Sequence, residues 1–174
     1  MKPVFSLESC VVRPWRREDA GPVARWADNP RIARFMRDRF PSPYTIRDAK
    51  RWIRAANGTE PVRHFAIEVD GEAAGGIGFD PYEDVDRRTA EIGYWLAEPH
   101  WGRGIATAAL VAVSGYAFEH FDVVRLQARV YEGNEPSMRV LEKAGYALEA
   151  RLRKSVTKYG RTIDSFLYSR LKEV

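Results

Sequence analysis

Apolar and polar residues alternate along much of the chain in short stretches, and segments with helical spacing separate these stretches. Two such stretches flank Asp70-Gly71, the strongest short hairpin signal in the chain. A helix start is indicated at Thr45-Ile46-Arg47-Asp48, which resembles a capping box with Asp in the Glu position. We predict strands over residues 7–13, 64–69, 72–79, 90–96, 124–131, 146–152 and 163–171, and helices over residues 18–28, 30–37, 45–56, 104–121 and 135–144.

This strand-rich order with helices in between predicts an α/β or α+β fold. Gly75, Gly76 and Gly78 lie in one predicted strand and indicate a bulge or a close backbone neighbour. The chain has 174 residues, the length of one ordinary domain, so we expect a single domain over residues 1–174.

Composition places the chain among globular proteins, with 45% hydrophobic and 30% charged residues. No apolar run approaches the roughly 18 residues that span a bilayer. The first residues also lack the apolar core of a signal peptide. We therefore expect a cytoplasmic protein with no membrane partner. Cys10, the single cysteine, lies in an apolar strand pattern and is interpreted as a packing residue.

The net charge of +4 is compatible with nucleic-acid binding, but Lys and Arg are interspersed with Asp and Glu and form no basic block. An anionic cofactor accounts for the same mild excess, so we expect no nucleic-acid partner. His64, His100 and His120 have no carboxylate or cysteine at ligand spacing, and we therefore expect no metal site.

The most informative segment is an apolar strand that runs into a glycine-rich turn, which then opens a helix. Gly102 and Gly104 lack Cβ atoms, so a ligand can approach the backbone and meet the N–H groups of the first helical turn. Arg103 adds a positive charge beside them. The segment therefore predicts a phosphate site, although glycines also follow strands in ordinary tight turns.

A second segment starts at Asn134, continues through Pro136 and Ser137, and ends at Gly145, as expected for a short helix. Together the two segments resemble the GNAT superfamily of acyl-CoA-dependent N-acyltransferases. The branch is that of the bacterial ribosomal-protein N-terminal acetyltransferases (RimJ/RimL-like). Its pattern reads AEIGYWL, a proline, WGKG or WGRG, IAT, and later N, S, K-A-G and an aromatic residue. The resemblance is specific over residues 90–146 and weaker elsewhere.

The resemblance implies a mixed, mostly antiparallel central sheet flanked by helices, in which two strands splay apart to form the cofactor cleft. Acetyl-CoA is the implied cofactor, with its pyrophosphate on the glycine-rich turn and its thioester oxygen held by a backbone N–H near Leu96. The residues implied in cofactor binding are Tyr94, Trp95, Leu96, Trp101, Gly102, Arg103, Gly104, Ile105, Ala106, Thr107, Asn134, Ser137, Arg139 and Lys143.

Two departures from the superfamily pattern limit this transfer of roles. Trp101 occupies a position that often holds Gln or Arg, and Leu141 stands where many members have a catalytic tyrosine. Ser137 is then the implied donor of a proton to the leaving sulfur, and Asn134 the implied partner of the pantetheine arm. Helix capping is the structural alternative for both residues, and a solvated helix face is the alternative for Arg139 and Lys143.

The general base is assigned to Glu91, whose structural alternative is an ion pair with Arg87 or Arg88. Glu149 has the same ambiguity. An α-amino group, with a pKa near 8, needs little help from a base, so solvent is a further alternative. The candidate acceptor site comprises four residues, which are Trp26, Phe35, Tyr82 and Glu91. The aromatic residues of the first helices equally suit a core, and the acidic loop over residues 80–86 suits either a cationic substrate or solvent.

We therefore expect an N-acetyltransferase that transfers the acetyl group of acetyl-CoA to a primary amine by direct attack in a ternary complex. We expect the amine to be a protein N-terminus, ribosomal or other, or a small-molecule amine. A homodimer is compatible with the family. Two alternatives remain at this point: a non-catalytic acyl-CoA sensor, and a dinucleotide-dependent oxidoreductase suggested by Gly102-x-Gly104-x-x-Thr107, which lacks the third glycine.

Overall fold

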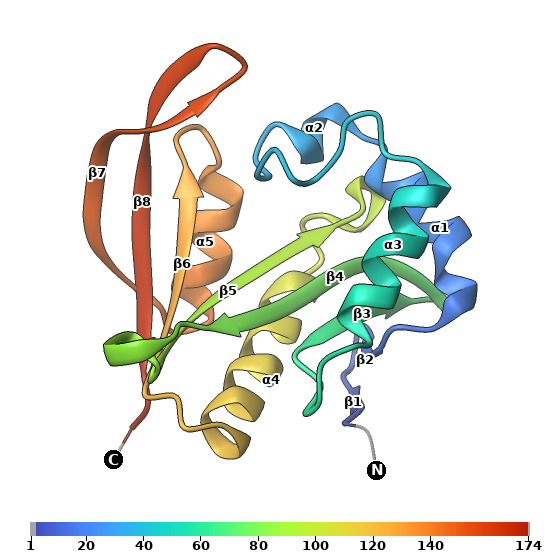
Figure 1. Ribbon diagram of the computed structural model, residues 1–174, viewed down its shortest axis with the longest axis horizontal. Helices are drawn as coiled ribbons and strands as arrows, with labels where there is room; N and C mark the ends of the chain where they lie inside the picture. The colour runs from blue at the N-terminus through green and yellow to red at the C-terminus, as the bar shows by residue number, and fades with distance from the viewer. Residues whose placement is uncertain (1–2, 174) are drawn as a thin grey trace.

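The computed structural model describes residues 3–173 and contains one eight-stranded sheet with the order β1-β2-β3-β4-β5-β6-β8-β7 (Figure 1). Every neighbouring pair is antiparallel except β5 and β6, which are parallel. The strands are β1 (Phe5–Ser6), β2 (Val11–Pro14), β3 (His64–Val69), β4 (Glu72–Pro81), β5 (Thr89–Leu96), β6 (Arg125–Tyr131), β7 (Ala147–Lys158) and β8 (Arg161–Leu171). The expected mixed, mostly antiparallel sheet is confirmed.

Helices pack on both faces of this sheet and form a separate hydrophobic core on each face. Side chains that alternate along β3 contribute to both cores. Phe65 and Ile67 point into a core shared with the long helix α4, whereas Ala66 points into a second core shared with α1 and α3. The α-helices are α1 (Ala20–Ala27), α2 (Pro30–Ala33), α3 (Ile46–Ala56), α4 (Ile105–His120) and α5 (Glu135–Lys143), and the short 3-10 helices are η1 (Arg17–Asp19), η2 (Asp84–Asp86) and η3 (Glu98–His100).

Most predicted elements form, with three corrections. The strand expected over residues 7–13 begins only at Val11, because Leu7 N–H donates to Cys10 O (2.9 Å) and closes a turn between β1 and β2. The helix expected over residues 30–37 is only the single turn of α2, and i→i+3 bonds such as Phe35 N–H to Ile32 O (3.0 Å) follow it. The hairpin of β7 and β8 is longer than the predicted strands. The prediction missed its tip because the residues there are mostly polar and show no alternating pattern.

The glycines of β4 produce both predicted features. The register of β3 and β4 shifts between Ile67 and Glu68, which marks a bulge. A Cβ at Gly75 would lie 2.5 Å from Trp95 O, and one at Gly78 would lie 2.3 Å from His64 Nδ1. The β4 backbone at Gly75 therefore approaches β5 too closely for a side chain, and the absence of a side chain at Gly78 leaves room for the His64 ring.

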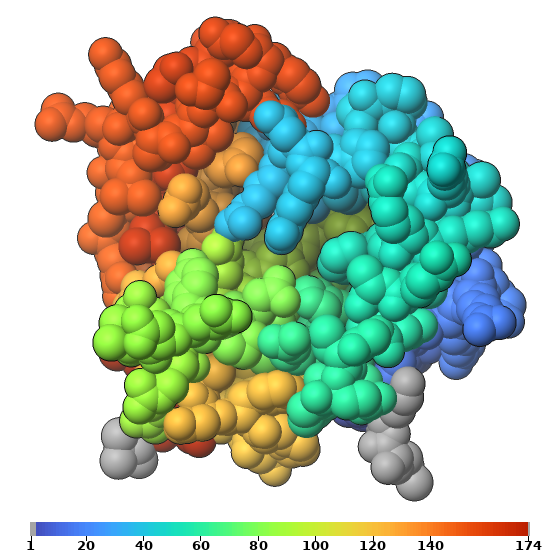
Figure 2. Space-filling view, in the orientation of Figure 1, coloured from blue at the N-terminus to red at the C-terminus, as the bar shows by residue number. Residues whose placement is uncertain are grey.

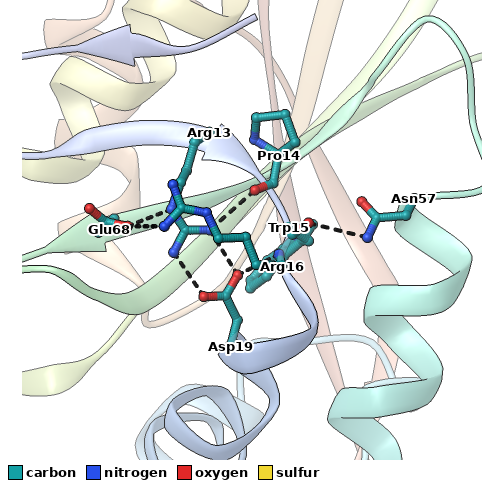
Figure 3. A network of polar contacts seen from close by, with 7 residues as sticks. All are labelled: Arg13, Pro14, Trp15, Arg16, Asp19, Asn57 and Glu68. Atoms are coloured by element: carbon teal, nitrogen blue, oxygen red, sulfur yellow. Dashed lines mark hydrogen bonds and ion pairs between the residues drawn. The ribbon is translucent and has the colours of Figure 1, made fainter. Parts of the chain in front are cut away.

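A buried ion network fixes the start of the helical region to the sheet (Figure 3). The Arg13 guanidinium donates to both carboxylate oxygens of Asp19 at 2.8 Å and to Glu68 at 2.5 Å. Asp19 also accepts from Arg16 N–H at 2.7 Å. Because Arg13 is only 3% exposed, removing either acid would leave buried guanidinium N–H groups without their hydrogen-bond partner. The network therefore determines how the chain turns from β2 into α1.

The first segment of α3 folds as its sequence predicts. Asp48 N–H donates to Thr45 Oγ1 (3.3 Å), and Thr45 N–H donates back to Asp48 Oδ2 (3.0 Å), which completes the capping box. Cys10 is buried and packs in the larger core. Within residues 3–173, no helix has the length and apolar character needed to cross a membrane.

Candidate active site

The candidate site begins where β5 and β6 separate. The two strands pair only at their first residues, ending at Glu91 and Gln127, after which β5 stays with β4 while β6 continues along β8. Ala97 N–H donates to Ala74 O of β4 (2.7 Å). In an antiparallel ladder the backbone N–H and C=O groups of adjacent residues point to opposite sides. The backbone groups of Leu96, which precedes Ala97, therefore face the gap. Two strands that splay apart, as expected, thus leave a free backbone edge.

A cleft of about 990 Å³ occupies this gap and continues over the glycine-rich face of β4. Figure 2 shows it as a hollow at the centre of the face, between the segment after α2, the strands β4 and β5, and the β7–β8 hairpin. The residues that line it include Phe35, Tyr44, Trp52, His64, Tyr82, Glu91, Tyr94, Asn134 and Ser137.

The glycine-rich turn lies between β5 and α4 and is exposed. Gly102 and Gly104 have φ of +73° and +76°, conformations that favour glycine, and a Cβ at either position would meet no protein atom within 4 Å. Gly104 is the N-cap of α4, so the N–H groups of the first turn, through Ala106 and Thr107, open toward that space. Ile105 points its side chain into the core and can contribute only its backbone N–H.

Trp101 and Arg103 have structural partners beside this turn. The Trp101 indole N–H donates to Leu96 O at 2.7 Å, which ties the turn to the end of β5. Arg103 donates to His100 Nδ1 at 2.9 Å from an exposed position. The single donor of Trp101 is therefore used to hold the loop, whereas the exposed Arg103 remains beside the helix N-terminus.

Ser137 forms a hydrogen-bonded pair with Tyr94 across the cleft wall. The two hydroxyl oxygens are 2.8 Å apart, and Tyr94 OH also donates to Ser137 O at 3.2 Å. Burial raises the pKa of Tyr94 well above its ordinary value, so its phenol stays protonated. Asn134 occupies the N-cap of α5 without a side-chain capping bond. Side-chain capping, the structural alternative for both residues, is therefore absent.

Glu91 is held by partners that the sequence did not indicate. Its carboxylate pairs with Arg37 and accepts from Tyr82 OH at 3.1 Å, and Gln127 Nε2 donates to the same phenol at 3.0 Å. The pairing with Arg87 or Arg88 is wrong, because Arg88 pairs with Asp122 at 2.9 Å and Arg87 donates to a backbone carbonyl. The helical region must fold over the sheet to bring Arg37 to Glu91, and no local pattern encodes that contact.

Other candidate residues divide between the cleft and the rest of the surface. Phe35 and Tyr82 line the cleft. Trp26 lies outside it, where its indole donates to Glu72 at 2.9 Å and packs near His100. Trp95 packs its ring against Phe40 and also lines the cleft. Arg139 and Lys143 are exposed on α5 and are absent from the cleft wall.

The sequence analysis missed one titratable pair in the cleft. His64 Nε2 and Asp80 Oδ1 are 3.0 Å apart, although sixteen residues separate them in sequence. The hairpin signal at Asp70-Gly71 contains the information, since it places His64 opposite Gly78. Among the described residues, no group of three or more His, Cys, Asp or Glu side chains is placed to hold a metal ion.

A model of the acetyltransferase (GNAT) domain matches residues 10–147, which is most of the chain. The chain belongs to the GNAT acetyltransferase family. It is therefore an acyltransferase of the GNAT fold, and the expected family is confirmed. Family membership also removes the dinucleotide-dependent oxidoreductase from consideration.

Three similar proteins support this membership over nearly the whole chain. An uncharacterized N-acetyltransferase p20 of Bacillus licheniformis is 30% identical over 171 residues, covering 95% of this chain and 94% of that protein. The putative ribosomal N-acetyltransferase YdaF of Bacillus subtilis is 34% identical over 153 residues, covering 86% and 78%. The structure of Mycobacterium smegmatis RimJ in complex with CoA-disulfide has a TM-score of 0.83 and 27% identity, and the match covers 97% of this chain and 86% of RimJ.

Proposed function

We propose that this acyltransferase moves an acetyl group from acetyl-CoA to a primary amine by direct attack in a ternary complex. The observation that carries the proposal is the separation of β5 from β6, which opens a cleft next to the Ser137–Tyr94 pair. The similarity to a CoA-bound RimJ structure supports the choice of cosubstrate.

The residues present fit CoA in chemistry and in space. The N–H groups over residues 102–107 and the positive end of the α4 dipole suit a pyrophosphate, and Gly102 and Gly104 leave the approach open. The free edge of β5 offers backbone groups to an extended amide arm. Leu96 O is already bonded to Trp101, so Leu96 N–H is the group left to polarise the thioester carbonyl.

Ser137 is the proposed donor of a proton to the leaving sulfur. Tyr94 holds the serine hydroxyl in place and, as a protonated phenol, can restore the proton that Ser137 gives up. Asn134, with its side chain free of a capping bond and in the cleft wall, is the proposed partner of the pantetheine arm. Glu91, bonded by Arg37 and Tyr82, shapes the acceptor wall and is poorly placed to accept a proton.

For the acceptor, charge favours an α-amino group of a peptide or a monoamine over a polyamine. The three acids in the cleft wall, Asp48, Asp80 and Glu91, each have a cationic or histidine partner. Within the described part of the chain, Arg39 and Arg129 line the cleft without an ion pair. A second positive charge on the acceptor would therefore meet unneutralised arginines.

A thiol-release assay with acetyl-CoA tests the function against a panel of peptides with free N-terminal alanine or serine, spermidine and an aminoglycoside. We expect CoA release with a peptide. If none of these amines causes CoA release, and acetyl-CoA still raises the melting temperature, the result would instead support a non-catalytic acyl-CoA sensor. A homodimer and a cytoplasmic location remain predictions of the sequence, and light scattering tests the first.

A further inference from the structure

His64 and Asp80 form a pair on the acceptor side of the cleft. His64 begins β3 and Asp80 lies near the end of β4, and the histidine side chain is only 13% exposed. The ring of Trp52 from α3 packs edge-on against the imidazole with centroids 5.3 Å apart. The ring is thus held between α3 and the sheet. We infer that His64 is the general base that takes a proton from the acceptor ammonium, an inference that rests on the proposed function.

The hydrogen bond fixes which nitrogen of His64 can act. The bond to His64 lowers the pKa of Asp80, so Asp80 is a carboxylate and accepts a proton from Nε2–H. In the neutral ring, Nδ1 then carries the lone pair. A Cβ at Gly78 would lie 2.3 Å from this atom, so Nδ1 lies directly above the glycine backbone. Only a glycine at this position leaves room for the imidazole.

The strand register places this base across β4 from β5, the strand whose Leu96 N–H is the proposed carbonyl donor. His64 is opposite Gly78, and Gly78 is opposite Gly93 on β5. Neighbouring strands are about 4.8 Å apart, and the imidazole leans over Gly78, so Nδ1 is roughly one strand spacing from Gly93. A Cβ at Gly93 would meet nothing within 4 Å, so this floor is open. The next residue, Tyr94, projects from the opposite face of β5 and holds the proposed acid Ser137, so the proposed base and acid lie on different faces of the sheet and both line the cleft.

The charged groups around His64 leave it as the available acceptor. Asp80 comes from β4, Asp48 and Arg51 from α3, Arg39 from the segment after α2, and Arg63 directly precedes His64. Asp48 is held by Arg51 and by the capping box. Arg39 and Arg63 lower the pKa of Asp80 further and keep it ionised. Among the cleft residues that the structure describes, each carboxylate has a bonded donor, whereas His64 Nδ1 has none.

The proton balance of the reaction is complete with these groups. His64 Nδ1 takes one proton from the ammonium through water, and the neutral amine attacks the thioester carbonyl. A carbon–nitrogen bond forms and the carbon–sulfur bond breaks. The sulfur takes a proton from Ser137, and the second proton lost by the amine nitrogen restores the hydroxyl groups. The imidazolium then releases its proton to water.

The first test is the pH dependence of kcat/KM for His64→Gln and Asp80→Asn, with the exposed His120→Gln as the matched control. We expect His64→Gln to lower kcat/KM about 10- to 100-fold at pH 7. The loss should shrink as the pH rises toward the pKa of the amine, because hydroxide then replaces the base. Asp80→Asn should lower activity less, and His120→Gln should leave it unchanged. A parallel pH profile for His64→Gln and wild type would overturn the inference.

Chemical rescue separates a base from a structural residue. In His64→Gly, added imidazole should restore part of the lost activity and should not stimulate wild type or Ser137→Ala. Activity that imidazole fails to restore, in a variant whose melting temperature still rises with acetyl-CoA, would also overturn the inference. Wild-type enzyme that releases no CoA with any amine of the panel would refute the proposed function, and this inference with it.

Discussion

Ser137 and Tyr94 should behave as one catalytic unit, because their hydroxyl oxygens are 2.8 Å apart and lie in the wall of the cleft. We expect Ser137→Ala to lower kcat by roughly 10- to 1000-fold with little change in the affinity for acetyl-CoA. A proton delivered to sulfur matters in the transition state and hardly at all in the ground state. Tyr94→Phe keeps the ring and removes the bond that orients the Ser137 hydroxyl, together with a longer bond to Ser137 O (3.2 Å).

The size of the Tyr94→Phe effect follows from that bond. A neutral hydrogen bond contributes about 0.5–1.5 kcal/mol, which corresponds to a loss of about 2- to 13-fold in kcat. In the double variant the phenol has no serine left to orient, so kcat should equal that of Ser137→Ala. Ser114→Ala is the matched control, because Ser114 forms a similar 2.7 Å hydroxyl pair with the buried Tyr146 away from the cleft.

The assay measures kcat, the affinity for acetyl-CoA and the melting temperature for all four variants. Ser114→Ala should lower the melting temperature and leave turnover per folded molecule unchanged. Independent losses that multiply in the double variant would refute the coupling between the two residues. Normal turnover in a less stable Ser137→Ala would refute the acid assignment, and the thiolate would then be protonated by water or by the ammonium formed on attack.

Three further changes test other parts of the structure. Gly104→Val should weaken acetyl-CoA binding more than the control Gly160→Val, which introduces similar backbone strain at φ +73° in the β7–β8 turn. Equal CoA dissociation constants for the two variants would mean that the phosphate site is misplaced. Gly78→Ala should displace His64 and lower kcat/KM with a loss similar to that of His64→Gln, measured by thiol release. Arg125 lowers the pKa of Glu149 to about 2, from 4.5 in the unfolded chain. This lowered pKa stabilises the fold at pH values above 4.5. Glu149→Gln should therefore cost at most about 1 kcal/mol at pH 7, because the pair is partly exposed, and the difference from wild type should vanish as the pH falls from 4.5 to 2 in urea unfolding experiments.

Local sequence patterns correctly predicted the elements that are formed by interactions between residues close together in the chain. The capping box at Thr45 and Asp48, the hairpin at Asp70-Gly71 and the glycine-rich turn before α4 all form as expected. Each depends on hydrogen bonds and backbone conformations within a few residues, so the chain specifies them before it folds. Motif resemblance added the family, and with it the splayed strands, which the structure contains.

Side-chain partners across the sheet were decided only by the tertiary structure. Glu91 was assigned as the general base, with an ion pair to Arg87 or Arg88 as the structural alternative, yet Arg37 reaches it from the segment after α2. Trp26 was expected near the acceptor, but its side chain lies outside the cleft, against Glu72. The bond of Tyr94 to Ser137 joins residues that are distant in sequence, whereas that of His64 to Asp80 follows from the register of the predicted hairpin. Strand register and helix packing bring such residues together. A contact between separate elements depends on how the whole sheet is ordered, and the residues near either partner in the sequence carry no record of it.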